Sequence, residues 1–192
     1  MSKKHPVVAI TGSSGAGTTT VKDACEHIFF RQKITPLVVE GDSFHSLDRA
    51  AFKKAVTEND EKGNNSFSHF GPEANHFDKI AETFQSYGES GSCKRRYYIH
   101  SDEEALFHNE RLGGTTYTAG EFTPWEDINE KTDLLFYEGL HGGVKDGDID
   151  VSKFVDLLIG VVPIVNLEWI QKIFRDNAQR GYSADVIVDT IL

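Results

Sequence analysis

Four short apolar runs recur along the chain, and each is bounded by polar residues, glycine or proline. They span residues 7–10, 37–39, 134–137 and 157–162. Apolar runs of this length, without the alternation of a half-exposed strand, are typical of strands that are buried on both faces of a sheet. A proline-free stretch of helical length at 18–32 separates the first two runs, so the chain begins with a βαβ unit. The pattern predicts an α/β fold: a mostly parallel sheet with helices on both faces.

The middle of the chain has a weaker pattern. Residues 57–75 are polar and contain glycine, asparagine and proline, which predicts a loop. A short helix is expected at 78–87, closed by Gly88, followed by a strand at 94–100 that is polar on both faces. Residues 101–124 predict a long irregular connection, and such connections in compact domains are often functional.

The C-terminal part of the chain has the period of an amphipathic helix at 167–177. The apolar positions are Leu167, Ile170, Ile173 and Phe174, and the polar ones are Lys172, Arg175, Asp176 and Gln179. We expect the apolar side to pack and the polar side to reach outward. Gly181 ends this helix, and Ser183 is the expected N-cap of another that runs to Leu192. We expect one domain over residues 1–192. Because the chain stops there in an apolar stretch without a helix stop signal, we expect that domain to be truncated at its C-terminus.

Composition narrows the classes of function. A chain of 192 residues with 39% hydrophobic and 26% charged residues is typical of one folded globular domain. The net charge of −10 gives no basic surface of the kind that nucleic acids require, so we expect no nucleic-acid partner. No apolar run reaches the about 18 residues of a membrane span, and the first run is too short for a signal peptide. The two cysteines, Cys25 and Cys93, indicate reduced thiols in a cytoplasmic protein without a membrane partner.

A glycine-rich turn lies between the first apolar run and the first helix. It consists of Gly12, Ser13, Ser14, Gly15, Ala16, Gly17, Thr18, Thr19 and Thr20. Glycines allow positive backbone dihedral angles and let a phosphate approach the backbone N–H groups at a helix N-terminus. The phosphate-loop pattern G-x-x-x-x-G-K-[ST] is met at Gly12, Gly17 and Thr19, but Thr18 stands at the lysine position. The turn predicts ATP binding in a P-loop fold; the alternative is a tight turn without a ligand.

The missing lysine has to be replaced, because phosphoryl transfer depends on positive charge around the β- and γ-phosphates. Lys172, Arg175 and Arg180 are the candidates. Thr19 is still at the position of the pattern whose hydroxyl is expected to bind Mg²⁺. The third apolar run ends in Glu138, which would put a metal-side acid at the carboxyl edge of the sheet beside the phosphate loop.

Further polar residues follow the second apolar run. Asp42 follows the carboxyl end of the second predicted strand, where it could accept a proton from the hydroxyl group of a substrate. The alternative is that Asp42 is only a turn residue. His45 and Arg49 follow, and an arginine near a base is suited to binding a substrate phosphate; a solvated Arg49 is the alternative. Alternating positions of the polar strand would share one face, which lines an anionic sugar site or is simply solvated. These positions are Lys94, Arg96, Tyr98 and His100.

Several segments together resemble the prokaryotic, class I phosphoribulokinases. They are residues 12–18, 40–45 with Arg49, 67–75, 134–142, 160–173, and Arg175-Asp176 with Arg180-Gly181. The resemblance spans nearly the whole chain and implies a P-loop kinase-like three-layer sandwich. It also implies an enzyme that uses ATP and Mg²⁺ to phosphorylate D-ribulose 5-phosphate at its 1-hydroxyl, giving ribulose 1,5-bisphosphate and ADP.

The resemblance implies roles for single residues. Threonine at the lysine position is normal in that family, so Thr18 implies a relocated charge rather than lost activity. Asp42 would be the base, Glu138 would lie on the Mg²⁺ side, and Asp176 would belong to the catalytic constellation. The residues implied to hold the sugar phosphate and the transferring phosphoryl group are His45, Arg49, Arg96, Tyr98, His100, Lys172, Arg175 and Arg180. Chains of that family continue beyond position 192 with strands that form a subunit contact, so the full-length form is expected to be a homo-oligomer.

Two other functions remain open at this point. Arg175-Asp176 and Arg180-Gly181 also resemble the lid segment of uridine kinase-type nucleoside kinases, although the segments at 67–75 and 94–100 argue against that reading. A nucleotide-binding regulatory relative without turnover is the other alternative, which the presence of both Asp42 and Glu138 disfavours.

Overall fold

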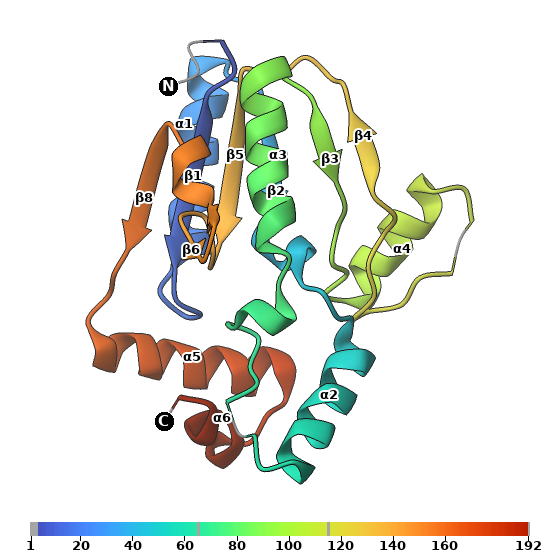
Figure 1. The fold of residues 1–192 in the computed structure, drawn as a ribbon, viewed down its shortest axis with the longest axis vertical. Helices are drawn as coiled ribbons and strands as arrows, with labels where there is room; N and C mark the ends of the chain where they lie inside the picture. Colours follow the sequence, from blue (N-terminus) through green and yellow to red (C-terminus); the bar gives the residue numbers. More distant parts are fainter. Residues whose placement is uncertain (1–3, 65, 115, 192) are drawn as a thin grey trace.

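The computed structural model describes residues 4–64, 66–114 and 116–191; the side chains of 179–180, 186 and 189–191 lie outside this description. Its centre is a four-stranded sheet with the strand order β2-β5-β1-β8, in which every neighbouring pair is parallel (Figure 1). The strands are β1 (Val7–Gly12), β2 (Pro36–Glu40), β5 (Leu134–Gly139) and β8 (Leu157–Val161). The four apolar runs therefore form the four strands of one sheet, as predicted.

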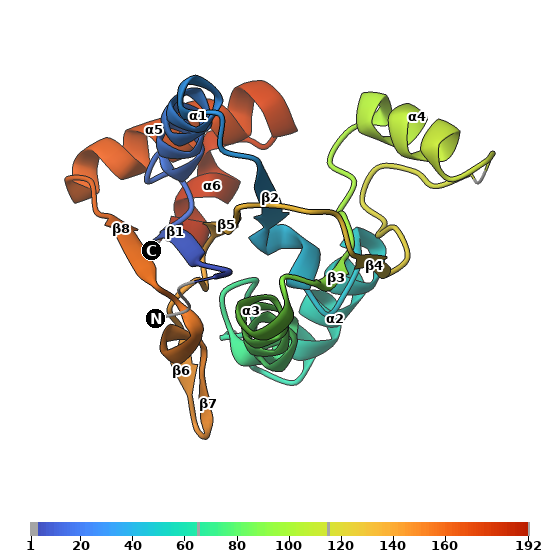
Figure 2. The ribbon, with the colours of Figure 1, turned by 90° about the horizontal axis from the view of Figure 1, so that it is seen from above.

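Helices cover both faces of this sheet (Figure 2). Alternate strand residues point to opposite faces, so each strand contributes to two cores. On one face Val7, Leu135 and Tyr137 pack with Phe84 of α3 (Phe77–Ser90). On the other face Ile10 and Phe136 pack with Val21, Cys25 and Phe29 of α1 (Thr18–Gln32). This confirms the predicted α/β sandwich of three layers.

Two helices were missed by the sequence prediction. The helix α2 (Arg49–Glu61) occupies the start of the stretch predicted as loop, and α4 (Asp102–Arg111) lies in the predicted irregular connection. Both have a side-chain N-cap: Asp48 accepts a hydrogen bond from the Ala51 N–H, and Ser101 accepts one from the Glu104 N–H. Ser101 and Glu104 have the S-x-x-E spacing of a capping box, which was a usable signal. The apolar pattern of α4 is weak, and that explains the miss.

The predicted boundaries around α3 also need correction. The helix passes through Gly88 and ends at Gly91, whose φ of 77° is the left-handed conformation that glycine adopts without strain. The next strand, β3 (Cys93–Arg95), is shorter than predicted and pairs antiparallel with β4 (Glu126–Ile128). Beyond it only Tyr98 makes a bridge, to Phe122, so the alternating residues from Lys94 onward do not share one regular strand face.

Smaller elements complete the described chain. A two-stranded ribbon is formed by β6 (Lys145–Asp146) and β7 (Ile149–Asp150). Three 3-10 turns are η1 (Gly41–Phe44), η2 (Pro72–Ala74) and η3 (Val151–Phe154). None of the helices within the described ranges is both long enough and apolar enough to cross a membrane.

The helix α5 (Val165–Arg180) lies across the carboxyl ends of the central strands, and α6 (Ala184–Ile191) follows it (Figure 1). Gly181, with φ of 70°, ends α5 as predicted, and the predicted end of α6 at Leu192 lies outside the described residues.

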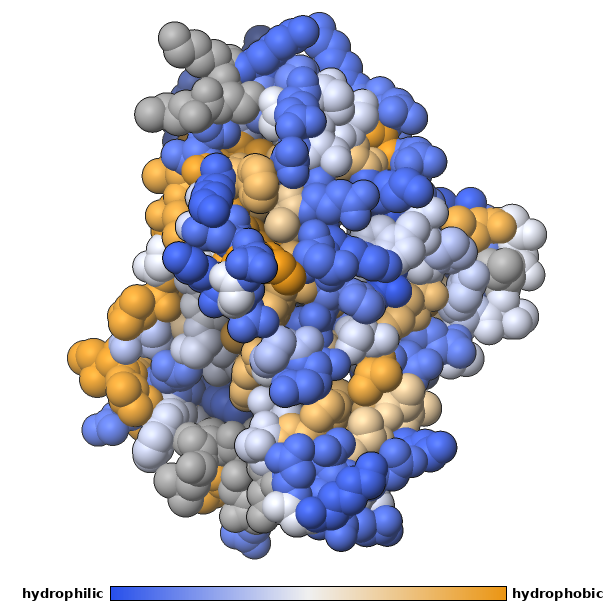
Figure 3. Space-filling view, viewed as in Figure 1, coloured by the Kyte–Doolittle hydropathy of each residue, from blue (hydrophilic) through white to orange (hydrophobic). Residues whose placement is uncertain are grey.

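The expected orientation of α5 was wrong. Most of its apolar side is exposed, with Leu167 48%, Ile170 51% and Phe174 73% accessible and Ile173 half-buried, while Asp176 on the polar side is 3% accessible. The surface view shows apolar residues gathering over β8 and the neighbouring end of α5 (Figure 3). Amphipathic period alone does not say which side a helix turns inward, and here charged side chains pack toward the glycine-rich turn.

Candidate functional site

The glycine-rich turn has the backbone conformation that a phosphate loop requires. Gly15 and Gly17 have φ values of 98° and 93°. A Cβ added at Gly12 would lie 2.8 Å from the Val161 carbonyl oxygen and 2.9 Å from Thr18 Cγ2. The N-cap of α1 is Gly17, so no side chain caps the helix there. The turn therefore presents backbone N–H groups and the positive end of a helix dipole to an anion.

The polar side of α5 lies directly over this turn. The Lys172 Nζ is 3.0 Å from Asp176 Oδ2, and the Arg175 Nε is 2.9 Å from Asp176 Oδ1. Arg175 Nη2 also donates a hydrogen bond to Ser14 Oγ at 3.0 Å. A single buried carboxylate thus holds two cations beside the phosphate loop, in the region where the sequence lacks the usual lysine. The side chain of Arg180, the third predicted cation, lies outside the described part of the structure.

A cleft of about 300 Å³ opens between the turn and the strand ends. Its lining includes Gly12, Ser13, Ser14, Gly15, Thr18, Thr19, Lys22, Glu40, Asp42, His100, Glu104, Glu138 and Arg175. Among the described residues no group of three or more His, Cys, Asp or Glu gathers around a metal position. Mg²⁺ beside a phosphate loop does not need such a group, because phosphate oxygens and water complete its shell. Thr19 and Glu138 line the same cleft, and their role in holding Mg²⁺ stays a prediction.

Lys22 and Glu40 are two residues of opposite charge that line the cleft and that were not predicted from the sequence. Lys22 lies one helical turn after Thr18, and its Nζ is 3.8 Å from Glu40 Oε1. Burial raises the pKa of Glu40, and the nearby Lys22 charge only partly opposes that effect. The spacing of Lys22 from Thr18 places it on the same side of α1, so this cation was detectable from the sequence.

Asp42 is held between two imidazole rings. His100 Nε2 lies 3.1 Å from Asp42 Oδ2, and His45 Nε2 lies 3.5 Å from Asp42 Oδ1. Burial acts to raise the pKa of Asp42, but the hydrogen bonds and charges of His100 and His45 outweigh it and leave that pKa below its ordinary value. The same hydrogen bond raises the pKa of His100. Asp42 is therefore an ionised carboxylate with one histidine on each oxygen.

Other predicted residues converge on Asp42 from separate elements. Arg49, at the start of α2, donates from Nη2 to the His100 carbonyl oxygen at 3.3 Å. The Tyr98 ring lies edge-on to the rings of His100 and His45. Glu104 Oε2 is 2.8 Å from the His100 backbone nitrogen and 3.2 Å from its Nδ1. Glu104 was not predicted, since α4 itself was not.

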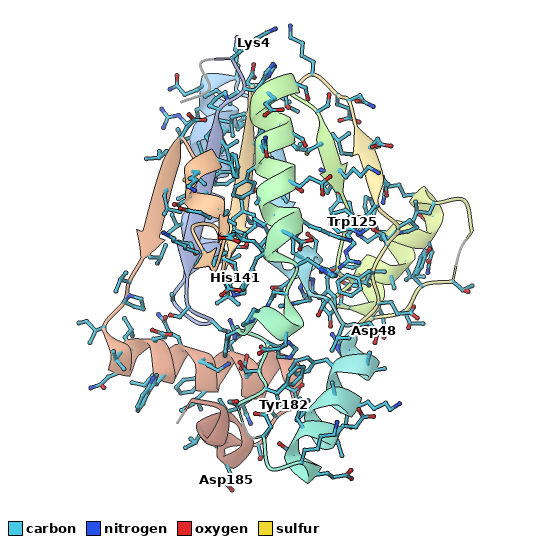
Figure 4. The ribbon with its side chains drawn as sticks, viewed as in Figure 1. Lys4, Asp48, Trp125, His141, Tyr182 and Asp185 are labelled. Atoms are coloured by element: carbon cyan, nitrogen blue, oxygen red, sulfur yellow. The ribbon has the colours of Figure 1, made fainter. Side chains whose placement is uncertain are left out.

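Arg96 occupies a different place from the one expected for a substrate-binding residue. Its Nε and Nη2 donate to the carbonyl oxygens of Ser43 and His45, both at 2.6 Å. The guanidinium lies over the rings of Phe122 and Trp125, and burial lowers its pKa to about 10. Figure 4 shows Trp125 beside α4 and His141 at the carboxyl end of the central strands. These contacts make Arg96 a support for the turn that carries Asp42, and substrate contact by Arg96 stays a prediction.

Comparison with known proteins decides the family. The model of the phosphoribulokinase/uridine kinase family matches residues 7–192. The chain belongs to the phosphoribulokinase/uridine kinase family. The plasmid phosphoribulokinase of Cupriavidus necator is 52% identical over 192 residues, which is 100% of this chain and 63% of that protein. The probable phosphoribulokinase of Escherichia coli is 48% identical, over 100% of this chain and 64% of that protein.

Solved structures of other proteins agree with the fold. A phosphoribulokinase from Rhodobacter spheroides superimposes with a TM-score of 0.81 and 41% identity, covering 99% of this chain and 62% of the other. A D-glycerate 3-kinase from Cryptococcus neoformans has a TM-score of 0.61 at 11% identity, over 98% of this chain and 76% of the other, and that likeness concerns the fold alone. The chain thus spans less than two thirds of the length of the phosphoribulokinases that it matches.

In this member of the phosphoribulokinase/uridine kinase family, the cleft brings together most of the predicted site. Residues of the glycine-rich turn, Asp42, His100, Glu138 and Arg175 line it, while His45, Lys172 and Asp176 contact lining residues. The sequence interpretation missed Asn75, whose Oδ1 is 2.8 Å from His45 Nδ1. It also missed His69, whose ring centroid is 5.4 Å from that of His45. Both lie in the segment 67–75, which supported the resemblance without a chemical role for either residue.

Proposed function

We propose that the chain transfers the γ-phosphoryl group of ATP to the 1-hydroxyl of D-ribulose 5-phosphate, giving ribulose 1,5-bisphosphate and ADP. The observation that carries the proposal is the arrangement of the cleft. A phosphate loop with two clamped cations forms one wall, and an ionised carboxylate between two histidines forms the other. The identity of 52% to a phosphoribulokinase supports this choice of substrate over a nucleoside.

In the proposed reaction the glycine-rich turn binds the ATP phosphates through backbone N–H groups. Thr19 and Glu138 would hold Mg²⁺, which when bound offsets the negative charge of the phosphates. Lys172 and Arg175 stabilise the charge on the transferring group. Arg49, His45 and Tyr98 lie where they could bind the phosphate of the sugar. A homo-oligomer and a cytoplasmic location stay predictions.

Asp42 accepts the proton of the attacking hydroxyl as that oxygen bonds to phosphorus and the bond to the ADP oxygen breaks. Each carboxylate oxygen can accept about two hydrogen bonds, so the contacts to His45 and His100 leave positions for the hydroxyl. A carboxylate with a lowered pKa is a weak base. Proton transfer is therefore expected late, when the hydroxyl has become acidic through its bond to phosphorus.

The test is an ADP-release assay of the purified chain with MgATP, offered ribulose 5-phosphate, uridine or no acceptor in parallel. We expect ADP release above the no-acceptor rate with ribulose 5-phosphate alone. Turnover with uridine alone would show a nucleoside kinase, and turnover with neither acceptor would show a binding protein; each result would overturn the proposal.

A further inference from the structure

Asn75 is a buried carboxamide, 6% accessible, whose polar atoms are all used. Its Nδ2 donates to the His69 carbonyl oxygen at 2.7 Å and to the Gly71 carbonyl oxygen at 2.8 Å. Its Oδ1 lies 2.8 Å from His45 Nδ1. Asn75 also forms an antiparallel bridge with His45 through the backbone. The side chain therefore joins the segment 67–75 to the turn that carries Asp42.

These partners determine which way the carboxamide is turned. An amide nitrogen can only donate, and a backbone carbonyl oxygen can only accept. If the amide were turned over, Oδ1 would face the carbonyl oxygens of His69 and Gly71, and both acceptors would lose the donor that they now share. With the amide fixed in this way, Oδ1 is the atom that meets His45, so His45 Nδ1 has to carry the hydrogen.

The other nitrogen of the ring is directed at the candidate base. His45 Nε2 lies 3.5 Å from Asp42 Oδ1. The remaining polar neighbours of this ring are His69 and Tyr98, with ring centroids at 5.4 and 6.3 Å, while Arg96 binds the His45 carbonyl oxygen. His141 is a further titratable neighbour of His45, and burial lowers the pKa of His141. Among the described residues named here, Asp42 is the group that lies within 4 Å of Nε2.

We propose that Asn75 is a positioning residue that holds His45 in the Nδ1–H tautomer, so that Nε2 of the neutral ring presents its lone pair toward Asp42. Protonated His45 donates from Nε2 to the ionised carboxylate. Neutral His45 presents a lone pair there, which becomes a hydrogen-bond acceptor once Asp42 carries the proton from the sugar hydroxyl. With the opposite tautomer, neutral His45 would donate to Asp42 permanently and could not accept from it. The expected effect of Asn75 on turnover rests on the proposed function, whereas the assignment of the His45 tautomer does not.

The tautomer can be measured directly in the whole chain with ¹⁵N-labelled histidine. Two-bond ¹⁵N–¹H NMR spectra distinguish a protonated Nδ1 from a protonated Nε2, and a His45→Gln variant assigns the signals. At a pH where the ring is neutral, we expect His45 to carry its hydrogen on Nδ1. A hydrogen on Nε2 would overturn the inference, whatever the activity of the chain.

Asn75→Leu removes the carboxamide but keeps the number and branching of the side-chain heavy atoms. We expect the His45 signals to change to a mixture of tautomers, and kcat with ribulose 5-phosphate to fall about tenfold, in the range of lost outer-shell partners. The KM for ATP should stay unchanged. The control is Asn109→Leu, because Asn109 likewise bridges a loop, through both backbone groups of Tyr117, without contacting a histidine of the cleft.

The outcomes separate this inference from the proposed function. An Nδ1–H tautomer in a chain without turnover would leave the inference standing and remove the function. If Asn75→Leu does not fold, the spectrum of the unmodified chain still decides the tautomer. A single Nδ1–H tautomer retained in folded Asn75→Leu would show that Asn75 does not control the ring, and would overturn the proposal.

Discussion

On the phosphate-loop side of the cleft, one continuous stretch, residues 12–20, supplies backbone groups, and Lys172 and Arg175 of α5 add two cations. On the Asp42 side, defined by Asp42, His45, Arg49, Tyr98 and His100, the groups are side chains from two separate stretches of chain. These are held by further residues such as Asn75, Arg96 and Glu104. The first side depends chiefly on local backbone conformation, to which α5 adds two cations, whereas the second depends on tertiary contacts throughout.

The largest expected effect concerns the Asp42 side. Asp42→Asn keeps the size of the side chain but removes the base, so kcat should fall by about 100-fold or more, in the range of a lost general base. The KM for ATP should change little, because the glycine-rich turn is untouched. Steady-state kinetics with ribulose 5-phosphate check this. Asp60→Asn, on the exposed side of α2, is the control, and an unchanged kcat in Asp42→Asn would remove Asp42 from the role.

A second expected effect concerns the phosphate-loop side. Asp176→Asn leaves Lys172 and Arg175 without their shared carboxylate, and removing the buried partner of these ion pairs should lower the free energy of unfolding by about 3 kcal/mol. Misplaced cations should also weaken ATP binding more than sugar-phosphate binding. Urea unfolding and the two KM values measure these effects.

Asp185→Asn, on the exposed surface of α6, is the matched control for this second effect. If Asp176→Asn raised only the KM for the sugar phosphate, the assignment of the α5 cations to the phosphate-loop side would be wrong.

The smallest expected effect is a dependence of stability on pH. The hydrogen bond to Asp42 raises the pKa of His100, so its stabilising contribution is fully present below its ordinary value of 6.5. That contribution is lost as the pH rises through the raised pKa. The pair is partly exposed, with 38% and 41% of the two side chains accessible, so the contribution should be under about 1 kcal/mol.

Urea midpoints of the wild type and His100→Gln at pH 6 and pH 9 measure this contribution. Their difference should shrink at the higher pH. A difference that grows from pH 6 to pH 9 would contradict the assignment of a protonated His100 beside Asp42.

The two sides also differ in how far the sequence predicted them. The turn at 12–20 and α1 were predicted with correct bounds, because glycine spacing and a helix N-terminus are properties of neighbouring residues. Asp42 and His100 were named, but the contact between residues 58 positions apart was not predictable from spacing. The regular strand face predicted to carry Arg96 is absent because β3 ends at Arg95, while the substrate role that the resemblance implies for Arg96 stays a prediction. The prediction chose the wrong side of α5 as the one that faces the rest of the fold, because a helical period does not say which side of the helix is turned inward.

The burial of Asp176 has a consequence for ionic strength. Salt screens exposed charges separated by about 8–10 Å or more at physiological concentrations, but screens close, buried pairs much less. Asp176 is 3% accessible and touches both of its cations at about 3.0 Å. Lys172 and Arg175 should therefore stay in position over the phosphate loop in concentrated salt. At the same salt concentration, the long-range attraction of an anion in solution toward the cleft should already be lost.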